Sequence, residues 1–252
     1  MNTCEITLPK VETTLEQNEE WIWINNGDKR RRILLHDYGA IYNIPGLYES
    51  IFCDTLKTRS PEVISSMLSH ELNKFAGEVD GLRVLDFGAG NGMVGEVLRR
   101  QTNCELIVGI DILLEAEKAA ERDRPGVYDE YYAIDMSQLE PSDREYLKSH
   151  GFNCLITVAA LGFGDIPTRA FVKAFNLIEN QGWIAFNIKD KFLANEDDTG
   201  FARLIRRMLN NDILHICSEH KYRHRFSING EKIYYIAIVG RKKHDINPDD
   251  LT

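Results

Sequence analysis

The alternation of hydrophobic and polar positions changes its period near residue 82. Beyond that point, short apolar runs that suit buried strands alternate with stretches in which apolar residues recur every three or four positions. The pattern predicts strands over residues 83–87, 106–110, 131–134, 154–159 and 183–188, and helices over 93–98, 113–122, 167–177 and 201–209. Strands that alternate with helices form a parallel sheet with helices on both faces, so the predicted fold class is α/β.

The last part of the pattern predicts an antiparallel hairpin. Residues 214–228 form one extended segment, Asn229-Gly230 is the strongest two-residue hairpin signal, and residues 232–239 return. Five parallel strands and this C-terminal hairpin give seven strands in all. A helix precedes them, because Ser60 is a capping residue, Pro61 suits the first helical position, and apolar residues follow at helical spacing.

The first 60 residues lack this regular alternation. Residues 1–20 are polar and predict a loose lead-in, whereas WIWI and KRRRILL, split by an Asn-Gly-Asp turn, fit either a hairpin or the start of a helix. Residues 36–59 are rich in aromatic side chains, Tyr42 and Tyr48 among them. We therefore expect residues 1–60 to be a lead-in and an N-terminal cap, residues 61–242 the main domain, and residues 243–252 a polar tail that frays.

Composition indicates an ordinary globular protein. The chain has 252 residues, of which 43% are hydrophobic, enough for one large core. Its 30 basic and 39 acidic residues give a net charge of −9, which makes nucleic acid an unlikely partner, because attraction to phosphates dominates that affinity. The basic run from Lys29 to Arg32 is short and is typical of a solvated face. Nucleic-acid binding that fell steeply with salt would overturn this expectation.

The cysteines and the N-terminus indicate the compartment. The five cysteines are widely spaced and form no C-x-x-C pair, so neither a metal site nor a disulfide framework is predicted. The N-terminus lacks the basic and apolar regions of a signal peptide. The longest apolar run, residues 154–163, is shorter than the ~18 residues that a membrane span requires. We therefore expect a cytoplasmic protein with no membrane partner.

The segment VLDFGAGNG, residues 84–92, carries the strongest chemical signal. Glycines at alternate positions between a strand and a helix let the backbone approach a ligand closely. The dinucleotide pattern G-x-G-x-x-G does not fit, because its third glycine would fall on Met93, and no Gly-Lys-Ser/Thr of a P-loop comes after it. Asp86, two residues before Gly88, suits a ligand with an ammonium group better than one with a pyrophosphate. A glycine turn that serves only close packing is the alternative.

This D-x-G-x-G-x-G pattern resembles motif I of the class I S-adenosylmethionine-dependent methyltransferases, whose Rossmann-like seven-stranded sheet also ends in a reversed hairpin. The resemblance implies a cofactor held by the glycine loop, by an acidic residue on the ribose, by an apolar residue on the adenine and by a further acidic residue after the third strand. The matching positions are Asp86, Gly88, Ala89, Gly90 and Asn91 in and before the loop, Asp111 with Ile112, Asp135 with Met136, and Thr157 with Ala159 at the end of the fourth strand. For a single aspartate, helix capping would be the simpler interpretation.

The residues around and after the fourth strand indicate which branch of the family the chain resembles. Residues 156–167, with upstream Tyr48 and residues 58–61, are similar to the Williams–Beuren-region methyltransferase-like branch, although Thr58 stands where an aromatic is usual. The N/D-P-P-F/Y run of amino-methylating nucleic-acid enzymes is absent. Cys154 has no preceding proline, unlike the nucleophile of the cytosine-carbon methyltransferases, and we expect it to be a small core residue.

The resemblance implies an enzyme that transfers a methyl group from S-adenosylmethionine to a small-molecule acceptor by in-line displacement. The alternative is a non-catalytic S-adenosylmethionine-binding regulator or partner subunit, and the glycine spacing disfavours a nicotinamide oxidoreductase. Tyr42 and Tyr48 are predicted either to form a lid over the cofactor or to pack on the edge of the sheet, and His36 is the first candidate for a general base. The sequence names neither the acceptor nor an oligomeric state.

Overall fold

The computed structural model describes residues 5–10, 15–26, 29–75, 81–193 and 199–247. Its contacts divide the chain into two compact units. Unit 1 comprises Met1–Arg59 and Arg223–Tyr234, and unit 2 comprises Ser60–Tyr222 and Tyr235–Thr252. The chain therefore passes from unit 1 to unit 2, back to unit 1 at the turn of the C-terminal hairpin, and again to unit 2.

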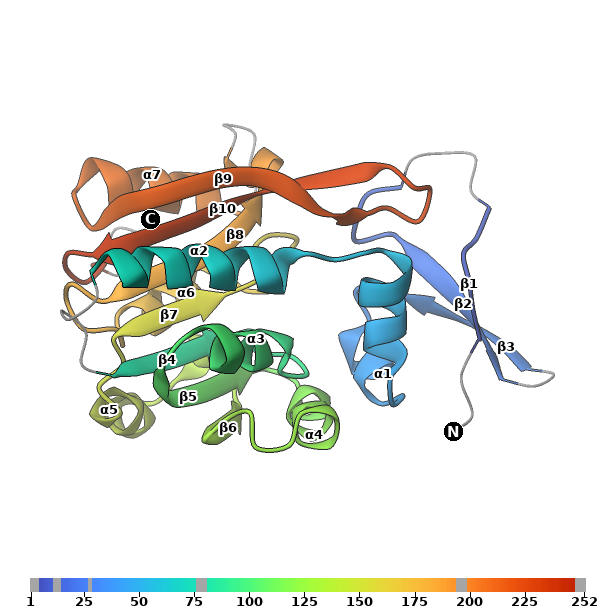
Figure 1. Ribbon diagram of the computed structural model, residues 1–252, viewed down its shortest axis with the longest axis horizontal. Helices are drawn as coiled ribbons and strands as arrows, with labels where there is room; N and C mark the ends of the chain where they lie inside the picture. The colour runs from blue at the N-terminus through green and yellow to red at the C-terminus, as the bar shows by residue number, and fades with distance from the viewer. Residues whose placement is uncertain (1–4, 11–14, 27–28, 76–80, 194–198, 248–252) are drawn as a thin grey trace. The chain divides into compact units, whose positions relative to one another are not determined.

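Unit 2 is built on a seven-stranded sheet in the order β6-β5-β4-β7-β8-β10-β9 (Figure 1). The strands are β4 (Leu82–Phe87), β5 (Cys104–Asp111), β6 (Glu130–Ala133), β7 (Cys154–Thr157), β8 (Trp183–Lys189), β9 (Leu214–Phe226) and β10 (Lys232–Lys242). The first five are parallel, and β10 pairs antiparallel with β8. The predicted Rossmann-like fold, with five parallel strands and a C-terminal antiparallel hairpin, is confirmed.

Within the described residues of unit 2, six α-helices pack against this sheet, and short 3-10 turns join them. They are α2 (Ser60–Lys74), α3 (Met93–Gln101), α4 (Leu114–Asp123), α5 (Pro141–Ser149), α6 (Thr168–Phe175) and α7 (Phe201–Asn210), with η2 (Met136–Gln138) and η3 (Asp190–Leu193). The sequence pattern does not predict α5, because Leu147 is its one buried residue and the rest of the helix is polar. Its start is nevertheless typical, since Pro141 occupies the first turn.

The side chains of β8 show how the two faces of the sheet differ. Phe186 lies in the main hydrophobic core, with its ring 6.0 Å from that of Phe171 on α6. The next residue, Asn187, points to the opposite face and bonds to Ser60 at the start of α2. Figure 1 accordingly shows α2 and α6 on opposite sides of the sheet. The core continues into residues 243–247, where Ile246 is buried, so this part of the predicted tail is anchored rather than frayed.

The described part of unit 1 contains a three-stranded antiparallel sheet, in the order β1-β2-β3, and two short helices. Its elements are β1 (Glu5–Thr7), β2 (Trp21–Asn26), β3 (Lys29–Leu34), α1 (Tyr38–Tyr42) and the π-helix η1 (Glu49–Thr55). Of the two interpretations of residues 21–35, the hairpin is confirmed. The expectation of a loose lead-in is wrong for residues 5–7, which pair with β2 through Thr7 opposite Trp23.

The core of unit 1 joins segments that lie far apart in the sequence. Ile22, Ile33 and Leu35 from the hairpin pack with Ile51 of η1 and with Ile228 from the turn between β9 and β10. Next to this core, the buried carboxylate of Glu20 forms an ion pair with buried Arg225 and accepts a hydrogen bond from the Ile228 amide at 2.8 Å. Residues 223–234 therefore complete unit 1.

Candidate active site

The glycine loop between β4 and α3 has the backbone that its sequence requires. The backbone φ values of Gly88, Gly90 and Gly92 are 78°, 54° and 87°, in a region that residues other than glycine rarely adopt. A Cβ atom at Gly88 would also lie 2.9 Å from the Cβ atom of Ala160, so the loop after β7 packs closely on it. The amides of Gly88 and Ala89 donate to the Ile110 carbonyl at 2.8 and 3.1 Å. These two amides hold the loop in place and are already bonded within the protein.

Asp86 is the second-last residue of β4, just before this loop, and is completely buried. The Tyr128 hydroxyl donates to its Oδ2 at 2.7 Å, whereas its Oδ1 has no hydrogen-bond partner among the described residues. Burial raises the pKa of Asp86 from 3.8 to about 7, and the nearby Asp111 carboxylate adds to this, against the opposing hydrogen bond from Tyr128. An orphaned, buried carboxylate oxygen is costly unless a donor reaches it. It is suited to a cationic or N–H donor group of a ligand.

Two tyrosines that the sequence pattern does not indicate support the loop from below. Tyr131 on β6 donates from its hydroxyl to the Gly90 carbonyl at 2.8 Å, and its ring lies against Tyr128, with the centroids 5.2 Å apart. A cavity of about 660 Å³ lies beside them, between α4 and residues 124–131. A Cβ atom at Gly109 would lie 2.7 Å from the Tyr131 ring. This glycine inside the apolar strand β5 is the signal that could have indicated close packing there.

Asp111, at the end of β5, is tied directly to the glycine loop. Its Oδ2 accepts a hydrogen bond from the Gly90 amide at 3.0 Å, and its Oδ1 accepts one from the Leu113 amide at 3.0 Å. Burial raises its pKa, against these two backbone hydrogen bonds. Because a carboxylate has about four acceptor sites, both oxygens can accept further bonds. The adjacent side chain of Ile112 is 61% exposed, so it offers an apolar surface at the rim.

Asp135 and Met136, at the end of β6, have different environments. Asp135 is exposed and caps η2 through a 2.8 Å bond from the Ser137 amide to its Oδ1. Hydrogen bonding by the side chain and by the amide of Ser137 lowers the pKa of Asp135. Met136 is buried in the main core. Within the protein, Asp135 therefore acts as a helix cap, which is the simpler interpretation of a single aspartate. A role of either residue toward the cofactor stays a prediction.

The end of β7 is held by a buried polar network that the sequence pattern does not predict. Ala159 has a φ of 57°, and its amide donates to Asn187 Oδ1 at 2.6 Å. The Asn187 Nδ2 donates to Ser60 Oγ at 3.0 Å and to the Tyr222 hydroxyl at 2.6 Å. Thr157 is also buried, and its Oγ1 has no partner among the described residues. Four elements thus fix the backbone at the rim where the predicted methyl-transfer site lies.

A protein-family model, described as a methyltransferase domain, matches residues 62–233. The match covers more than half of the chain and includes the glycine loop and all three aspartates. The chain belongs to this methyltransferase family. No curated protein sequence is significantly similar to it. The expected class, an S-adenosylmethionine-dependent methyltransferase with that compound as its cofactor, is confirmed. The family model does not distinguish branches, so the Williams–Beuren-region resemblance stays a prediction.

Solved structures support the fold of this methyltransferase. The N-methyltransferase NodS from Bradyrhizobium japonicum, in complex with S-adenosyl-L-homocysteine, is 12% identical, with a TM-score of 0.54 over 82% of this chain and 97% of that one. An S-adenosylmethionine-dependent methyltransferase from Clostridium acetobutylicum is 12% identical, with a TM-score of 0.51 over 78% and 96%. A protein from Thermoplasma acidophilum is 19% identical, with a TM-score of 0.50 over 80% and 97%.

The residues predicted for a lid and a base lie in unit 1 of the methyltransferase. Tyr42 and Tyr48 stack with their ring centroids 5.4 Å apart, and Tyr38 and Phe52 extend the cluster. The His36 ring is 5.6 Å from that of Tyr38. The three predicted residues therefore belong to one aromatic cluster of unit 1, and their roles in lid closure and proton transfer stay predictions.

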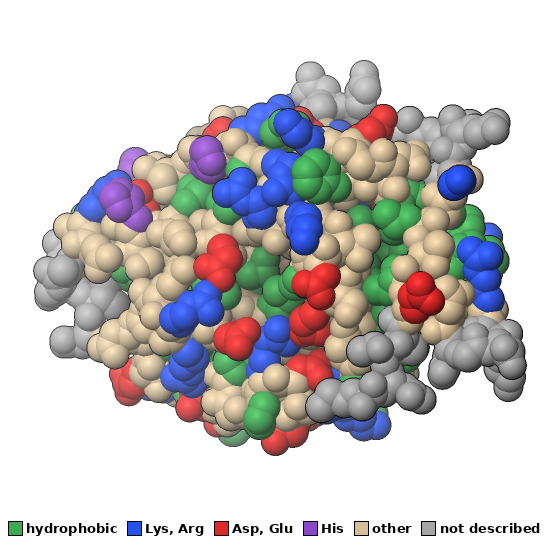
Figure 2. Space-filling model, turned by 45° about the vertical axis from the view of Figure 1, so that its right-hand side comes forward, with side chains coloured by type: hydrophobic (Ala, Val, Ile, Leu, Met, Phe, Trp, Pro, Cys, Tyr) green, Lys and Arg blue, Asp and Glu red, His purple; other side chains and the backbone are tan. Residues whose placement is uncertain are grey.

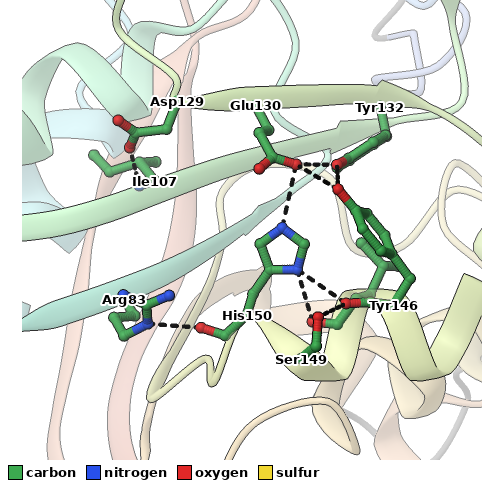
Figure 3. A network of polar contacts seen from close by, with 9 residues as sticks. Arg83, Ile107, Asp129, Glu130, Tyr132, Tyr146, Ser149 and His150 are labelled. Atoms are coloured by element: carbon green, nitrogen blue, oxygen red, sulfur yellow. Dashed lines mark hydrogen bonds and ion pairs between the residues drawn. The ribbon is translucent and has the colours of Figure 1, made fainter.

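A second polar network of the methyltransferase lies at the outer strand of the sheet, apart from the glycine loop (Figure 3). The Glu130 carboxylate accepts hydrogen bonds from the Tyr132 hydroxyl and, at 3.4 Å, from the Tyr146 hydroxyl, and it lies 3.2 Å from His150 Nε2. The His150 Nδ1 faces the Tyr146 carbonyl at 3.1 Å. These contacts join β6 to the C-terminal end of α5, and we assign them a structural role.

Among the described residues, no group of three His, Cys, Asp or Glu side chains is arranged to hold a metal ion. No disulfide joins the four cysteines within the described ranges, Cys53, Cys104, Cys154 and Cys217, and Cys4 lies outside them. Within the same ranges, no helix has the length and apolar character needed to cross a membrane.

Proposed function

We propose that this protein methylates a small-molecule acceptor, with the cofactor bound at the carboxyl ends of β4, β5 and β6. The observation that carries the binding site is the buried Asp86 oxygen that lacks a partner among the described residues. It lies next to a loop whose three glycines have positive φ and in which a Cβ atom at Gly88 would meet Ala160, at the end of a parallel strand. Ligands of open α/β sheets bind at these strand ends.

In the proposed complex, each carboxylate binds a different part of the cofactor. The ammonium group of the methionyl part would satisfy Asp86, whose pKa of about 7 allows it to ionise when a cation approaches. The ribose hydroxyls would donate to Asp111, whose two backbone bonds already orient its oxygens. Ile112 would cover the adenine, and Asp135 would accept from its amino group. For Met136 we propose backbone contact, since its side chain is in the core.

When bound, the cofactor supplies a methyl group that its sulfonium makes electrophilic. The task of the protein is to hold the acceptor atom in line with the methyl carbon and to exclude water, which can lower the barrier by roughly 7–11 kcal/mol. The Asn187 network contributes by fixing Ala159 and Thr157 at the rim. We propose Tyr42 and Tyr48 as the shield from water and His36 as the first general base to test.

Calorimetric titration with S-adenosyl-L-homocysteine tests the cofactor site. Asp111→Ala should weaken binding by at least tenfold, because it removes the acceptors of both ribose hydroxyls and frees the Gly90 amide. Asp111→Asn is the matched control and should lose less, since it keeps one acceptor oxygen. Unchanged affinity in Asp111→Ala, with a folded circular dichroism spectrum, would show that this carboxylate does not hold the cofactor.

The lid proposal needs a separate test. Removing residues 1–55 would also remove Glu20, the partner of buried Arg225, so that deletion would disturb the folding of unit 1. Tyr48→Ala is the better variant, because Tyr48 is only half-buried. It should weaken retention of the cofactor in a protein that is still folded at the assay temperature, while the lost contacts with Tyr42 and Phe52 lower the melting temperature. Equal cofactor affinity and turnover in Tyr48→Ala and the parent would reject the lid.

A further inference from the structure

The outer face of the unit 1 sheet carries an ordered ladder of tryptophan and arginine. We call the side chains of Trp21, Trp23, Arg30 and Arg32 the Trp–Arg face. In the antiparallel register Trp23 pairs with Arg32, so alternate residues of β2 and β3 project on the same side. The guanidinium of Arg30 lies 4.2 Å from the Trp23 ring centroid, and that of Arg32 lies 4.6 Å from the Trp21 ring centroid. The two indole rings meet edge to face at 5.0 Å.

This face is separate from the core of unit 1. The alternate residues Ile22, Ile24 and Ile33 point to the opposite side and are buried. By contrast, Arg30 and Arg32 are exposed, and neighbouring Leu34 is 43% exposed. Figure 2 shows hydrophobic and basic side chains lying against one another on the molecular surface, on its right-hand side. The inner isoleucines form the core of unit 1, whereas Trp21 and Trp23 lie on the opposite side of the sheet and are half-buried.

The arginines keep their capacity to bind anions. Within the part of the chain that the structure describes, no carboxylate forms an ion pair with Arg30 or Arg32. Glu5 projects on the same side but from β1, where it pairs with Asn25. A guanidinium stacked on an indole still presents its edge N–H donors, which match a phosphate in a two-pronged geometry.

Unit 1 has no net charge, although the whole protein is acidic. Unit 1 contains as many basic as acidic residues, so the whole net charge of −9 belongs to unit 2. The total charge therefore does not exclude nucleic acid at the Trp–Arg face. Arg31 lies between Arg30 and Arg32 on β3 and is also exposed. It pairs with Ile24, so its side chain projects from the face of the sheet opposite the Trp–Arg face.

We propose that the Trp–Arg face binds single-stranded nucleic acid. Unpaired bases stack on aromatic rings and on guanidinium planes, and this face holds both, in alternation and in contact. The phosphates would accept from the edges of Arg30 and Arg32. An acidic peptide would use the two charges but not the ring surfaces, whereas a single strand uses both. Exposed ring and guanidinium surfaces suit a strand with splayed bases better than a duplex, whose bases are stacked on one another.

The test is fluorescence titration of the full-length protein with single-stranded 12-mers of uridine and of thymidine, in excess S-adenosyl-L-homocysteine. Stacking should quench emission from Trp21 and Trp23, because the third tryptophan, Trp183, is buried. The double variant Arg30→Ala/Arg32→Ala should lose about tenfold in affinity or more. Its logarithmic salt dependence should become shallower by about 1.4, since each phosphate contact in a single strand contributes about 0.7.

Arg31→Ala is the matched control, because it removes the same charge from the same strand on the other side. It should bind within about twofold of the parent protein. Preference for uridine over thymidine oligomers, or the reverse, distinguishes RNA from DNA, and either supports the proposal. Equal losses in Arg31→Ala and the double variant, equal affinity for a hairpin duplex or for polyglutamate, or a change of oligomeric state without oligonucleotide binding would each overturn it.

Discussion

Asp86 combines two properties that conflict in a folded protein, complete burial and an ionisable group. Its pKa of about 7 in the folded state is above the ordinary value of 3.8, so the folded protein binds a proton that the unfolded chain has already released. Stability of the ligand-free protein therefore falls as the pH rises between these two values. This is the reverse of the usual behaviour of a carboxylate in a salt bridge, and it marks Asp86 as a residue kept for a ligand.

The first prediction concerns the stability of the ligand-free protein. Asp86→Asn should raise the free energy of unfolding at pH 8 by on the order of a few kcal/mol, because the amide needs no ionisation and still accepts from Tyr128. The gain should vanish near pH 4. Urea unfolding at both values measures it. Asp135→Asn is the control of opposite sign, since a hydrogen bond lowers the pKa of that exposed carboxyl. A gain that does not depend on pH would contradict the explanation.

A second prediction concerns the cofactor and its dependence on pH. If the ammonium group binds ionised Asp86, the affinity for S-adenosyl-L-homocysteine should fall about tenfold per pH unit below about pH 7 and level off above it. Methylthioadenosine lacks the amino-acid part, so its affinity should change little over the same range. Calorimetry with both ligands makes the comparison. Parallel pH profiles for the two ligands would place the ammonium elsewhere.

The sequence identifies the carboxylates of the site better than it identifies their partners. Asp86 and Asp111 stand at the ends of predicted strands, and strand ends meet at one rim for any parallel sheet. Tyr128 contacts Asp86 across 42 positions of sequence, from a polar segment without periodicity. Asn187 reaches Ser60 across 127 positions. Such contacts depend on how distant elements are placed side by side in the folded sheet, and a local sequence pattern carries no information about that placement.

At the scale of elements, the Asn187 network joins the start of α2, the end of β7, β8 and β9. Its donors and acceptors satisfy one another in a place where water is excluded, so each loss leaves several groups unpaired. Asn187→Leu should lower the free energy of unfolding by on the order of 3 kcal/mol, because the Ala159 amide and the Ser60 and Tyr222 hydroxyls lose a partner.

The milder variant Tyr222→Phe distinguishes the contribution of hydrogen bonding to stability from that of side-chain packing. It removes one hydroxyl and keeps the ring, so about 1 kcal/mol should be lost. Urea unfolding of both variants gives the comparison. A smaller loss in Asn187→Leu than in Tyr222→Phe would mean that the network does not stabilise the rim.

The elements that the sequence predicted are those with a strong period. Strands β4, β5, β7 and β8 and helices such as α6 have clear apolar faces, and all are found, together with the shorter predicted strand β6, whose residues are half-buried. The sequence did not predict α5, β1 and η1, nor the short elements α1, η2 and η3. The first is mostly polar, the second has three residues, and the third is a π-helix, whose hydrogen-bond pattern has no simple sequence period. In each case contacts with the rest of the unit, rather than local preference, determine the structure.

At the scale of the whole molecule, unit 1 depends on two distant parts of the chain. Arg225→Ala would leave Glu20 buried without its ion partner, and such a loss costs about 3–5 kcal/mol. We expect faster hydrogen exchange in residues 21–56 and 223–234, with little change in β4, β5 and β7. The double variant Glu20→Leu/Arg225→Met should recover only part of the loss, because a well-packed apolar pair can replace a buried ion pair but leaves the Ile228 amide without its acceptor. Faster exchange throughout both units would contradict this.

The discontinuity of unit 1 also sets an order of events during synthesis. Residues 20–56 leave the ribosome long before Arg225 and Ile228 are translated, and at about 5–20 residues per second the interval is roughly 10–40 s. During that time the inner isoleucines of β2 and β3 lack part of their core, and Glu20 lacks its partner. The nascent chain therefore has to keep its first segment from aggregating until its last strands emerge, which makes that segment a natural client for chaperones.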